Sequence, residues 1–421
     1  MTAPVTTDEL SDKASGAKAA SVVLAQASTD LKNRALAAIA GAIRARETEI
    51  LAANAQDCQN ASPRVEIDRL RLTPQRVAGM ARDVEAVASL ADPIGEQFDR
   101  ITRPNGLVIS KRRVPLGVVG VVYESRPNVT SDVAAICLKT GNAVVLRGGS
   151  EALSSNRAIA AAIHAGLKEV GLPETSVQMI TSTDRALVQR MLKLRKYIDV
   201  IIPRGGEGLI KATIENATIP VIETGAGVCH TYVDRAADPA MAVDIVYNAK
   251  VRRPTICNAL DTVLVHRDIA PSWLPKMAVE LSKARVEIRA DEEASRALRA
   301  SGAASVPASA DDFGKEFLSL VAAVKVVASL DDALEHIRRH GSGHSEAIVT
   351  EDAQAASRFL NEVDAAAVFV NASTQFTDGG EFGLGAEVGI STQKLHARGP
   401  MGLRELTTYK WIVEGTGQVR E

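Results

Sequence analysis

Residues 117–123 read Gly-Val-Val-Gly-Val-Val-Tyr, and residues 143–146 read Ala-Val-Val-Leu. Both runs are almost wholly apolar and rich in the branched residues that favour strands, and residues 131–140 between them have the spacing of a helix. A strand without polar alternation is buried on both faces, and strands that alternate with helices form parallel sheets. The segment therefore predicts a parallel sheet that is covered by helices on both sides.

The same alternation continues along the chain and predicts a doubly wound, nucleotide-binding unit with its ligand at the carboxyl ends of the strands. A second α/β unit is expected after residue 257. The further elements of the first unit are helices at 154–170, 184–194 and 209–217 and strands at 177–180 and 198–202. In the second unit, strands are expected at 262–266, 286–288, 323–327, 345–349 and 367–370, helices at 271–284, 329–339 and 353–363, and a surface loop at 301–312.

Two segments depart from this alternation. Residues 8–90 are predicted to be helical, because apolar residues such as Leu36, Ile39 and Ile43 recur at helical spacing. Residues 99–114 predict a β-hairpin, because Asn-Gly at 105–106 is a strong two-residue turn signal between two charged strands. A lone hairpin is barely stable in water, so it is expected to dock on another element or on a second subunit.

The composition limits the possible functions. A chain of 421 residues is long enough for two or three domains. Its net charge of -2 and its 3% of aromatic residues favour neither nucleic acid nor an anionic membrane as a partner. The first residues do not form a signal peptide pattern, and the four cysteines are too widely spaced for a disulfide framework or a zinc knuckle. A cytoplasmic protein with reduced thiols is expected.

Cys257 is the strongest candidate for a catalytic residue. It follows Arg252 and Arg253 closely and lies just before the apolar run 263–265, at the mouth of a predicted strand. A thiolate is the nucleophilic form of cysteine, and nearby cations favour it. The alternative is a buried cysteine that serves as a small hydrophobic residue. The flanking arginines and the strand mouth favour the nucleophile.

Two glycine-rich turns follow predicted strands. One is Arg204-Gly205-Gly206, which precedes a helix, and the other is Arg147-Gly148-Gly149-Ser150. Glycines at such a turn let backbone N–H groups approach a phosphate, and two turns at neighbouring strand ends favour a dinucleotide. A plain tight turn is the alternative for the first. Arg147 is suited to the 2′-phosphate of NADP rather than to NAD, and the alternative is a solvated loop cation.

Two polar residues at predicted strand ends are further candidates. Glu223 is a candidate general base, or else a helix cap or a hydrogen-bonding partner. Asn128 is a candidate donor to an oxyanion, although an isolated Asn at such a place is more often a turn residue.

His336, His340 and His344 are spaced four residues apart, which is a spacing that metal-binding helices use. Residues 341–343, Gly-Ser-Gly, are expected to end the helix before His344, and no companion Glu or Asp motif is present. No metal site is therefore expected.

Several of these segments together resemble the aldehyde dehydrogenase superfamily, and within it the branch of γ-glutamyl phosphate reductases. Arg126-Pro127-Asn128 takes the place of the superfamily's Pro-Trp-Asn, and Glu223-Thr224-Gly225 resembles its Glu-Leu-Gly-Gly segment. Glu316-Phe317 resembles the Glu-x-Phe segment whose Glu holds the ribose on the nicotinamide side. The reductase branch is marked by three longer matches, at 253–262, 327–348 and 382–392.

The chain departs from the wider superfamily at three places. Arg147-Gly148-Gly149 replaces the usual Lys-Pro, Ala226 replaces a second Gly, and Leu318-Ser319 replaces Phe-Gly. These departures suit the reductase branch.

The resemblance implies reduction of L-glutamate 5-phosphate by NADPH to glutamate 5-semialdehyde and phosphate, in proline biosynthesis. It makes Cys257 the nucleophile that forms a thioacyl intermediate, gives Asn128 the oxyanion, and matches Glu223 to the base of hydrolytic relatives. Glu223 ranks lower, because a base beside a thioester promotes hydrolysis. The cofactor contacts expected are Arg147, Gly148, Gly149, Ser150, Gly205, Gly206 and Glu316. The substrate contacts expected are Arg126, Arg252 and Arg253, on charge alone, with Ser373 and Thr374.

The resemblance also implies an aldehyde-dehydrogenase-like α/β fold with a Rossmann-type cofactor domain, an α/β catalytic domain and a small β oligomerisation element. The NADP-binding domain is expected at residues 1–97 and 116–227, the catalytic domain at 228–405, and the oligomerisation hairpin and tail at 98–115 and 406–421. A homodimer or homotetramer is expected. A complex with glutamate 5-kinase is a further expectation, because an acyl phosphate is labile.

Two other functions stay open from the sequence. A hydrolytic NAD(P)-dependent aldehyde dehydrogenase would share Cys257, Asn128 and Glu223, but it would not need phosphate to oxidise an aldehyde. A non-catalytic NADP-binding protein would not need the intact segment around Cys257.

Overall fold

The computed structural model describes residues 8–63 and 67–420. Contacts divide this part of the chain into two compact units, which are described separately. Unit 1 runs to Thr224 and also takes in Gly383–Gly389 and the residues from Met401 onward. Unit 2 comprises Gly225–Phe382 and Ile390–Pro400.

The main sheet of unit 1 has four parallel strands in the order β5-β4-β3-β6. The central strand β3 is buried along its whole length, as its unbroken apolar sequence predicts. The helices that alternate with the strands confirm the predicted α/β alternation. The elements are β3 (Val118–Tyr123), α6 (Asn128–Lys139), β4 (Ala143–Arg147), α7 (Leu153–Glu169), β5 (Val177–Met179), α8 (Arg185–Met191), β6 (Val200–Arg204) and α9 (Glu207–Asn216).

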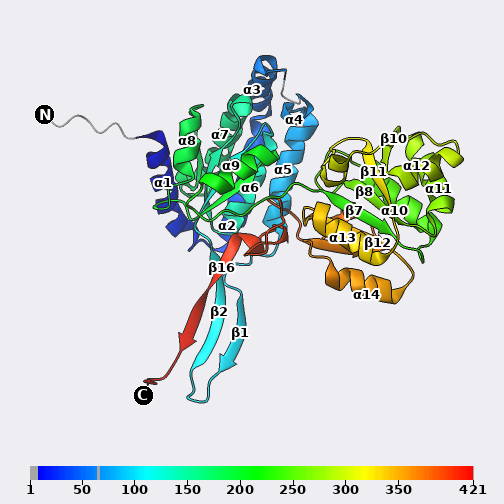
Figure 1. Cartoon of the computed structure of the whole chain (residues 1–421). Helices are drawn as coiled ribbons and strands as arrows, with labels where there is room; N and C mark the ends of the chain where they lie inside the picture. Colours follow the sequence, from blue (N-terminus) through cyan, green and yellow to red (C-terminus); the bar gives the residue numbers. More distant parts are fainter. Residues whose placement is uncertain (1–7, 64–66, 421) are drawn as a thin grey trace. The chain divides into compact units, whose positions relative to one another are not determined.

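The helical segment expected before residue 90 is confirmed within the described residues. α2 packs against both α5 and α7, and Gly166 of α7 lets the backbones approach closely, because a β-carbon there would lie 2.5 Å from the Ile39 nitrogen. Figure 1 shows these helices around the unit 1 sheet. They are α1 (Glu9–Leu24), α2 (Thr29–Ala45), α3 (Glu47–Asn60), α4 (Ile67–Leu70) and α5 (Pro74–Ser89).

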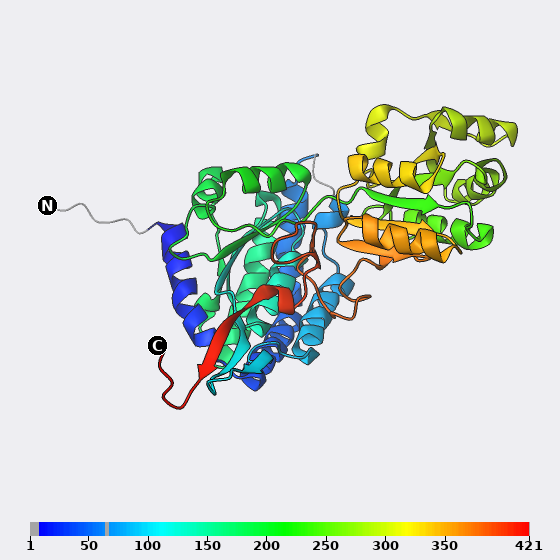
Figure 2. The ribbon, with the colours of Figure 1, turned by 60° about the horizontal axis from the view of Figure 1, so that its bottom comes forward.

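The predicted hairpin is confirmed and has a third strand. β1 (Gln97–Thr102) and β2 (Val108–Pro115) pair antiparallel, and Gly106 in their turn has a φ of 86°. β16 (Thr407–Glu414), near the end of the chain, pairs with the other edge of β2 along its whole length. The strand β16, drawn in red, lies beside β2 in Figures 1 and 2. The hairpin thus docks on a strand of its own chain.

Unit 2 contains a parallel sheet of seven strands in the order β10-β9-β11-β8-β7-β12-β13. Five of them confirm the predicted strands. The structure also contains a short two-stranded antiparallel pair, β14 (Ile390–Ser391) with β15 (Gly399–Pro400). The seven strands are β7 (Cys229–Val233), β8 (Leu260–His266), β9 (Glu287–Ala290), β10 (Val306–Pro307), β11 (Val321–Val327), β12 (Ser345–Val349) and β13 (Ala367–Val370).

Two expectations for unit 2 were wrong. Its sheet does not begin after residue 257, because β7 precedes that position. The sequence of β7 mixes polar with apolar residues, so it lacks the apolar run that marks the other strands, yet His230 and Thr231 are completely buried. The segment 301–312 is not only a loop, since it contains β10 and the start of a 3-10 helix at Ala310–Gly314.

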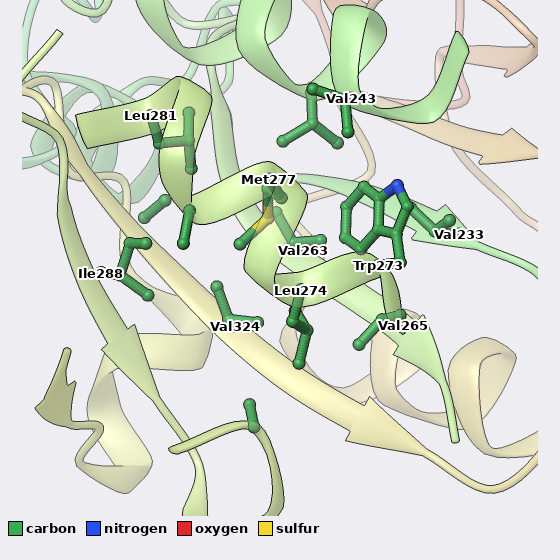
Figure 3. Close-up of a cluster of buried hydrophobic side chains, with 14 of the residues drawn as sticks. Val233, Val243, Val263, Val265, Trp273, Leu274, Met277, Leu281, Ile288 and Val324 are labelled. Atoms are coloured by element: carbon green, nitrogen blue, oxygen red, sulfur yellow. The ribbon is translucent and has the colours of Figure 1, made fainter. Parts of the chain in front are cut away.

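Alternate residues of the unit 2 strands face two different cores. Val263 and Val265 pack under α10, α11 and α12, and Leu264 between them packs against α13 and α14. Figure 3 shows Trp273, Leu274 and Met277 of α11 beside Val263, Val265 and Val324. The helices are α10 (Pro239–Val251), α11 (Ala270–Lys283), α12 (Glu292–Ala300), α13 (Leu330–His340) and α14 (Ala353–Glu362).

α13 ends at His340 with Gly341 as its C-terminal cap, which confirms the predicted break before His344. Among the described residues, no helix is both long and apolar enough to cross a membrane.

Candidate functional site

Cys257 lies in the turn that joins α10 to β8, three residues before β8 begins. Its side chain is half-buried. The nucleophile candidate therefore belongs to the amino end of the unit 2 sheet. None of the four cysteines, all of which lie in the described part of the chain, forms a disulfide.

Gly227 packs directly against the backbone of Cys257. A β-carbon on Gly227 would lie 1.5 Å from the Cys257 carbonyl oxygen and 3.1 Å from its Cα, so only glycine fits here. The Gly227 N–H donates to Glu316 Oε1 at 3.0 Å. On the other side, the Cys229 thiol donates to the Cys257 carbonyl oxygen at 3.3 Å. The structure therefore brings Glu316, one of the expected cofactor contacts, close to the turn that carries Cys257.

Residues 373–377 also hold the Cys257 turn in place through hydrogen bonds. Asn258 Nδ2 donates to the carbonyl oxygens of Gln375 and Thr377, at 3.2 and 3.0 Å, and Thr374 Oγ1 donates to the Asn258 carbonyl oxygen at 2.8 Å. Ser373 Oγ accepts from the Gln375 N–H at 3.3 Å. The side chains of Ser373 and Thr374, expected to touch substrate, are both buried. The contacts seen here support the Cys257 turn.

The two arginines before Cys257 are exposed. Arg252 Nη1 donates to Gln375 Oε1 at 3.4 Å, and the Arg253 carbonyl oxygen accepts from Gln375 Nε2 at 3.3 Å. Gln375 thus contacts both arginines, one through its guanidinium group and the other through its backbone carbonyl group. The resemblance pointed to the segment 371–376 for the substrate, but not to this role of Gln375, which depends on contacts with residues more than a hundred positions away.

The remaining catalytic candidates lie in unit 1. Asn128 is the first residue of α6, and its Nδ2 donates to Asp132 Oδ2 at 2.8 Å. Arg126 is exposed in the turn before this helix. Glu223 is half-buried, and its neighbour Thr224 donates through Oγ1 to the Pro203 carbonyl oxygen at 2.7 Å. The candidates are therefore shared between the two units, with Arg126, Asn128 and Glu223 in the first and Cys257 in the second.

The glycine-rich turns both stand at carboxyl ends of unit 1 strands, which is where open α/β sheets bind ligands. They follow β4 and β6, which flank β3 on either side, so the expectation that they adjoin one another was wrong. Gly148 is required for packing, because a β-carbon there would lie 2.3 Å from Asn156 Nδ2. Gly149 and Ser150 continue that turn, with Ser150 exposed.

The second turn fits a phosphate through its helix. Gly206 is the N-cap of α9, a helix of 10 residues, and no side chain caps it. The first N–H groups of such a helix suit an anion. A β-carbon on Gly205 would lie 2.6 Å from the end of the Glu124 side chain, which is exposed and would have to move aside. Arg147, at the end of β4, donates through Nη2 to the Thr183 carbonyl oxygen at 3.5 Å. Both turns therefore lie at the edge where such sheets bind ligands.

The histidines do not form a metal site. Across residues 8–63 and 67–420, no group of three or more His, Cys, Asp or Glu side chains is placed to hold a metal ion. The rings of His336 and His340 pack together with centroids 4.5 Å apart, and His336 also meets the ring of Phe313. Burial lowers the pKa of His336 to about 2, so it is neutral at physiological pH.

Sequence reasoning missed one buried pair of charges beside Cys257. Lys250 and Asp261 are both fully buried, in the last turn of α10 and at the start of β8. Asp261 carried a signal, since it is the one charged residue in the run 254–265, whereas Lys250 carried none because Arg252 and Arg253 follow it closely. Buried charges are rarely found without partners, so an isolated charge such as Asp261 predicts a buried partner of opposite sign.

Comparison with known proteins is consistent with this geometry. The sequence profile described as the aldehyde dehydrogenase family matches residues 2–298. A γ-glutamyl phosphate reductase from Dehalococcoides mccartyi strain 195 is 57% identical, with 98% of each chain covered. A protein of the same name from Escherichia coli O6:K15:H31 is 54% identical, with 96% of this chain and 98% of the relative covered.

Among solved structures, the γ-glutamyl phosphate reductase of Thermotoga maritima superposes with a TM-score of 0.95 at 50% identity. The match covers 98% of this chain and 100% of that one.

Proposed function

The chain belongs to the aldehyde dehydrogenase family and, within it, to the γ-glutamyl phosphate reductases, and from this premise we propose its reaction path. As a reductase of proline biosynthesis, or glutamate-5-semialdehyde dehydrogenase, it converts L-glutamate 5-phosphate to glutamate 5-semialdehyde. We propose that NADPH is the reductant and that the acyl group passes through Cys257. The observation that carries this path is the contact that Gly227 makes with both Cys257 and a proposed cofactor residue. Gly227 packs directly against the Cys257 carbonyl group and donates its N–H to Glu316.

In the first step the Cys257 thiolate attacks the acyl phosphate carbonyl. A carbon–sulfur bond forms, the bond to the phosphate oxygen breaks, and inorganic phosphate leaves with the electron pair. The Asn128 amide and the backbone N–H of Cys257 are proposed to stabilise the oxyanion of the tetrahedral intermediate. Arg126, Arg252 and Arg253 are the proposed cations for the leaving phosphate, because all three are exposed and permanently charged.

In the second step the thioester is reduced. NADPH, when bound, supplies the hydride. The resulting hemithioacetal on Cys257 collapses, the aldehyde leaves and the sulfur returns to its thiolate form. Glu316 is proposed to fix the ribose next to the nicotinamide, and the turns at Gly148, Gly149, Ser150, Gly205 and Gly206 are proposed to hold the rest of the cofactor.

The preference for NADP over NAD is proposed to come from Arg147, whose guanidinium stands at the carboxyl end of β4. Glu223 is proposed not to act as a base in this reaction, because activating water beside the thioester would divert it to the free acid. Ser373 and Thr374 are proposed to lie near the glutamyl end of the substrate. Their side chains hydrogen-bond to the backbone of Gln375 and Asn258, so they would act by holding that backbone in place.

The sheet of β1, β2 and β16 is proposed to be the oligomerisation element of a homodimer or homotetramer, because Tyr409 and Trp411 are exposed on it. A cytoplasmic location is proposed from the reduced state of all four cysteines. A transient complex with glutamate 5-kinase is proposed from the lability of the acyl phosphate.

The reverse reaction tests the path. Glutamate 5-semialdehyde and NADP are incubated with the wild-type chain and with Cys257→Ala, with and without phosphate, and NADPH is followed by absorbance. NADPH that forms only with phosphate and only with Cys257 supports the proposal. NADPH that forms without phosphate would identify a hydrolytic dehydrogenase and make Glu223 its base.

A further inference from the structure

Lys250 and Asp261 form a buried ion pair beside the turn that carries Cys257. Lys250 Nζ lies 3.7 Å from Asp261 Oδ1 and donates to the Leu260 carbonyl oxygen at 2.6 Å. Burial of two charges is costly unless their remaining hydrogen-bonding capacity is used. Replacing both with apolar residues of similar size is often harmless to stability, so the pair raises the question of a specific role.

The Asp261 carboxylate joins two segments that are distant in the sequence. Its Oδ1 accepts from the Phe317 N–H at 2.9 Å, and its Oδ2 accepts from the Cys229 N–H at 3.4 Å. The ring of Phe317 also lies 5.8 Å from Lys250 Nζ. The carboxylate therefore fixes the start of β7 relative to the segment 316–317.

Each of these two segments continues to the Cys257 turn. Phe317 follows Glu316, whose Oε1 accepts from Gly227, and Gly227 packs against the Cys257 carbonyl group. Cys229 donates through its thiol to that same carbonyl oxygen. One contact of the Asp261 carboxylate is therefore with the residue next to Glu316. The other is with Cys229, which is one hydrogen bond away from Cys257.

We propose that Asp261, neutralised by Lys250, is a positioning residue that sets the place of the Glu316 carboxylate relative to the Cys257 sulfur. This inference rests on the proposed function in one respect, namely that Glu316 contacts the ribose beside the nicotinamide. The pair then governs the step in which the hydride moves and leaves the reactivity of the thiol unchanged. Misplacement of reacting groups by about 1 Å can slow a step roughly 100-fold.

Titration of the pair agrees with this role. Burial raises the pKa of Asp261 to about 6, and the nearby Glu316 carboxylate also raises it, although Lys250 and the two backbone N–H groups oppose the shift. Burial likewise lowers the pKa of Lys250, against the pull of Asp261. The carboxylate is therefore charged at neutral pH and takes up a proton near pH 6, where its hold on the two N–H groups weakens.

The test uses the full chain with Asp261→Asn. The pre-steady-state burst of NADPH from glutamate 5-semialdehyde, NADP and phosphate reports the hydride step. Alkylation by iodoacetamide in the absence of substrates reports the Cys257 thiol when it is followed on the peptide that contains Cys257, because Cys58 is also partly exposed. We expect the burst to slow roughly 10- to 100-fold while the alkylation rate stays within about twofold. The pH dependence of the burst near 6 is expected to vanish in the variant.

A matched control separates positioning from stability. Lys32 and Asp92 of unit 1 form a second buried ion pair, with side chains 2% and 6% exposed. Asp92→Asn is expected to lower the thermal midpoint and to leave the burst unchanged. If the burst falls equally in both variants, or if alkylation slows in parallel with it, the role of Asp261 is only structural and the inference is overturned.

Coupling to Glu316 provides the second readout. If Asp261 acts through Glu316, then Asp261→Asn adds little to the defect of Glu316→Gln, whereas independent effects add. Should Asp261→Asn fail to fold, Lys250→Met is subjected to the same measurements with the same expected and overturning results. A wild-type chain without any phosphate-dependent activity would refute the proposed function, whereas an active wild type with a normal burst in the variant would refute this inference alone.

Discussion

Asp132 Oδ2 accepts a hydrogen bond from Asn128 Nδ2 at 2.8 Å, one turn further along α6. An amide has two N–H bonds, so the contact fixes the direction of the second, which is the proposed oxyanion donor. Asp132→Asn is expected to lower kcat/KM roughly 10-fold through loss of this orientation. Steady-state rates of the reverse reaction check it, and an unchanged kcat/KM would contradict it.

The same carboxyl group predicts a dependence of stability on pH. Burial raises the pKa of Asp132 to about 7, although the hydrogen bond from Asn128 opposes the shift. The folded-state pKa lies above the unfolded value of about 4, so the stability from the neutral form is fully present below pH 4 and is lost as the pH rises through 7. The thermal midpoint of the wild type, relative to Asp132→Asn, should fall across this window. A difference between the two thermal midpoints that stays constant from pH 4 to 8 would contradict this dependence.

Gly227→Ala is expected to abolish most activity. The added methyl group would occupy the space of the Cys257 carbonyl oxygen, so the turn must move. We expect phosphate-dependent NADPH formation to fall about 100-fold, as for other misplaced reacting groups. Gly41→Ala is the matched control, because a β-carbon there meets nothing within 4 Å and alanine favours a helix over glycine by about 1 kcal/mol. Equal activities of the two variants would refute the packing argument.

Glu9 predicts an acid-sensitive contact in unit 1. Burial raises its pKa, but hydrogen bonds from Lys13 and Thr181 outweigh this and lower it to about 2. The folded-state pKa lies below the unfolded value, so the stabilisation is present above about pH 4.5 and is lost as the pH falls toward 2. Glu9→Gln should cost about 1–2 kcal/mol at pH 7 in urea unfolding, and much less near pH 2. A cost that does not depend on pH would disprove it.

Trp411→Ser is expected to weaken self-association. Trp411 is 57% exposed on β16, where Lys111 Nζ lies 5.0 Å from its ring. Exposed aromatic residues carry a large part of the binding energy when a partner covers them. The dissociation constant of the oligomer should therefore rise at least about 10-fold. Sedimentation velocity at micromolar concentration measures this. Val419→Ser, at an 85% exposed position, is the control; a wild type that is monomeric at this concentration contradicts the proposal.

The sequence predicted most of the fold because the strands of both sheets are apolar on both sides. β3 and β4 of unit 1, and β8 and β11 of unit 2, were visible for this reason. β7 was not, because His230 and Thr231 are polar. The burial of the His230 ring depends on a partner elsewhere in the chain, since its Nδ1 lies 2.9 Å from Glu346 Oε2.

Of the candidate site, Cys257 and the glycine turns follow from local patterns. Glu316 required the resemblance to a family, and its contact with Gly227 required the structure. Asp261 stands out in the sequence only as an isolated charge, and Lys250 does not stand out because two arginines follow it closely. Their pairing joins α10 to β8 across the Cys257 turn, and no local sequence pattern predicts such a contact.

The pairing of β2 with β16 also constrains the order in which the protein can be completed. The ribosome synthesises β2 before residues 225–382 of unit 2 and β16 only after them, since the two strands lie at 108–115 and 407–414. During translation of the whole of unit 2, the edge of β2 that β16 will cover stays open, and an open strand edge invites pairing with other chains. A nascent chain that stalls before residue 407 therefore exposes the unpaired edge of β2, along which a second chain can add a strand.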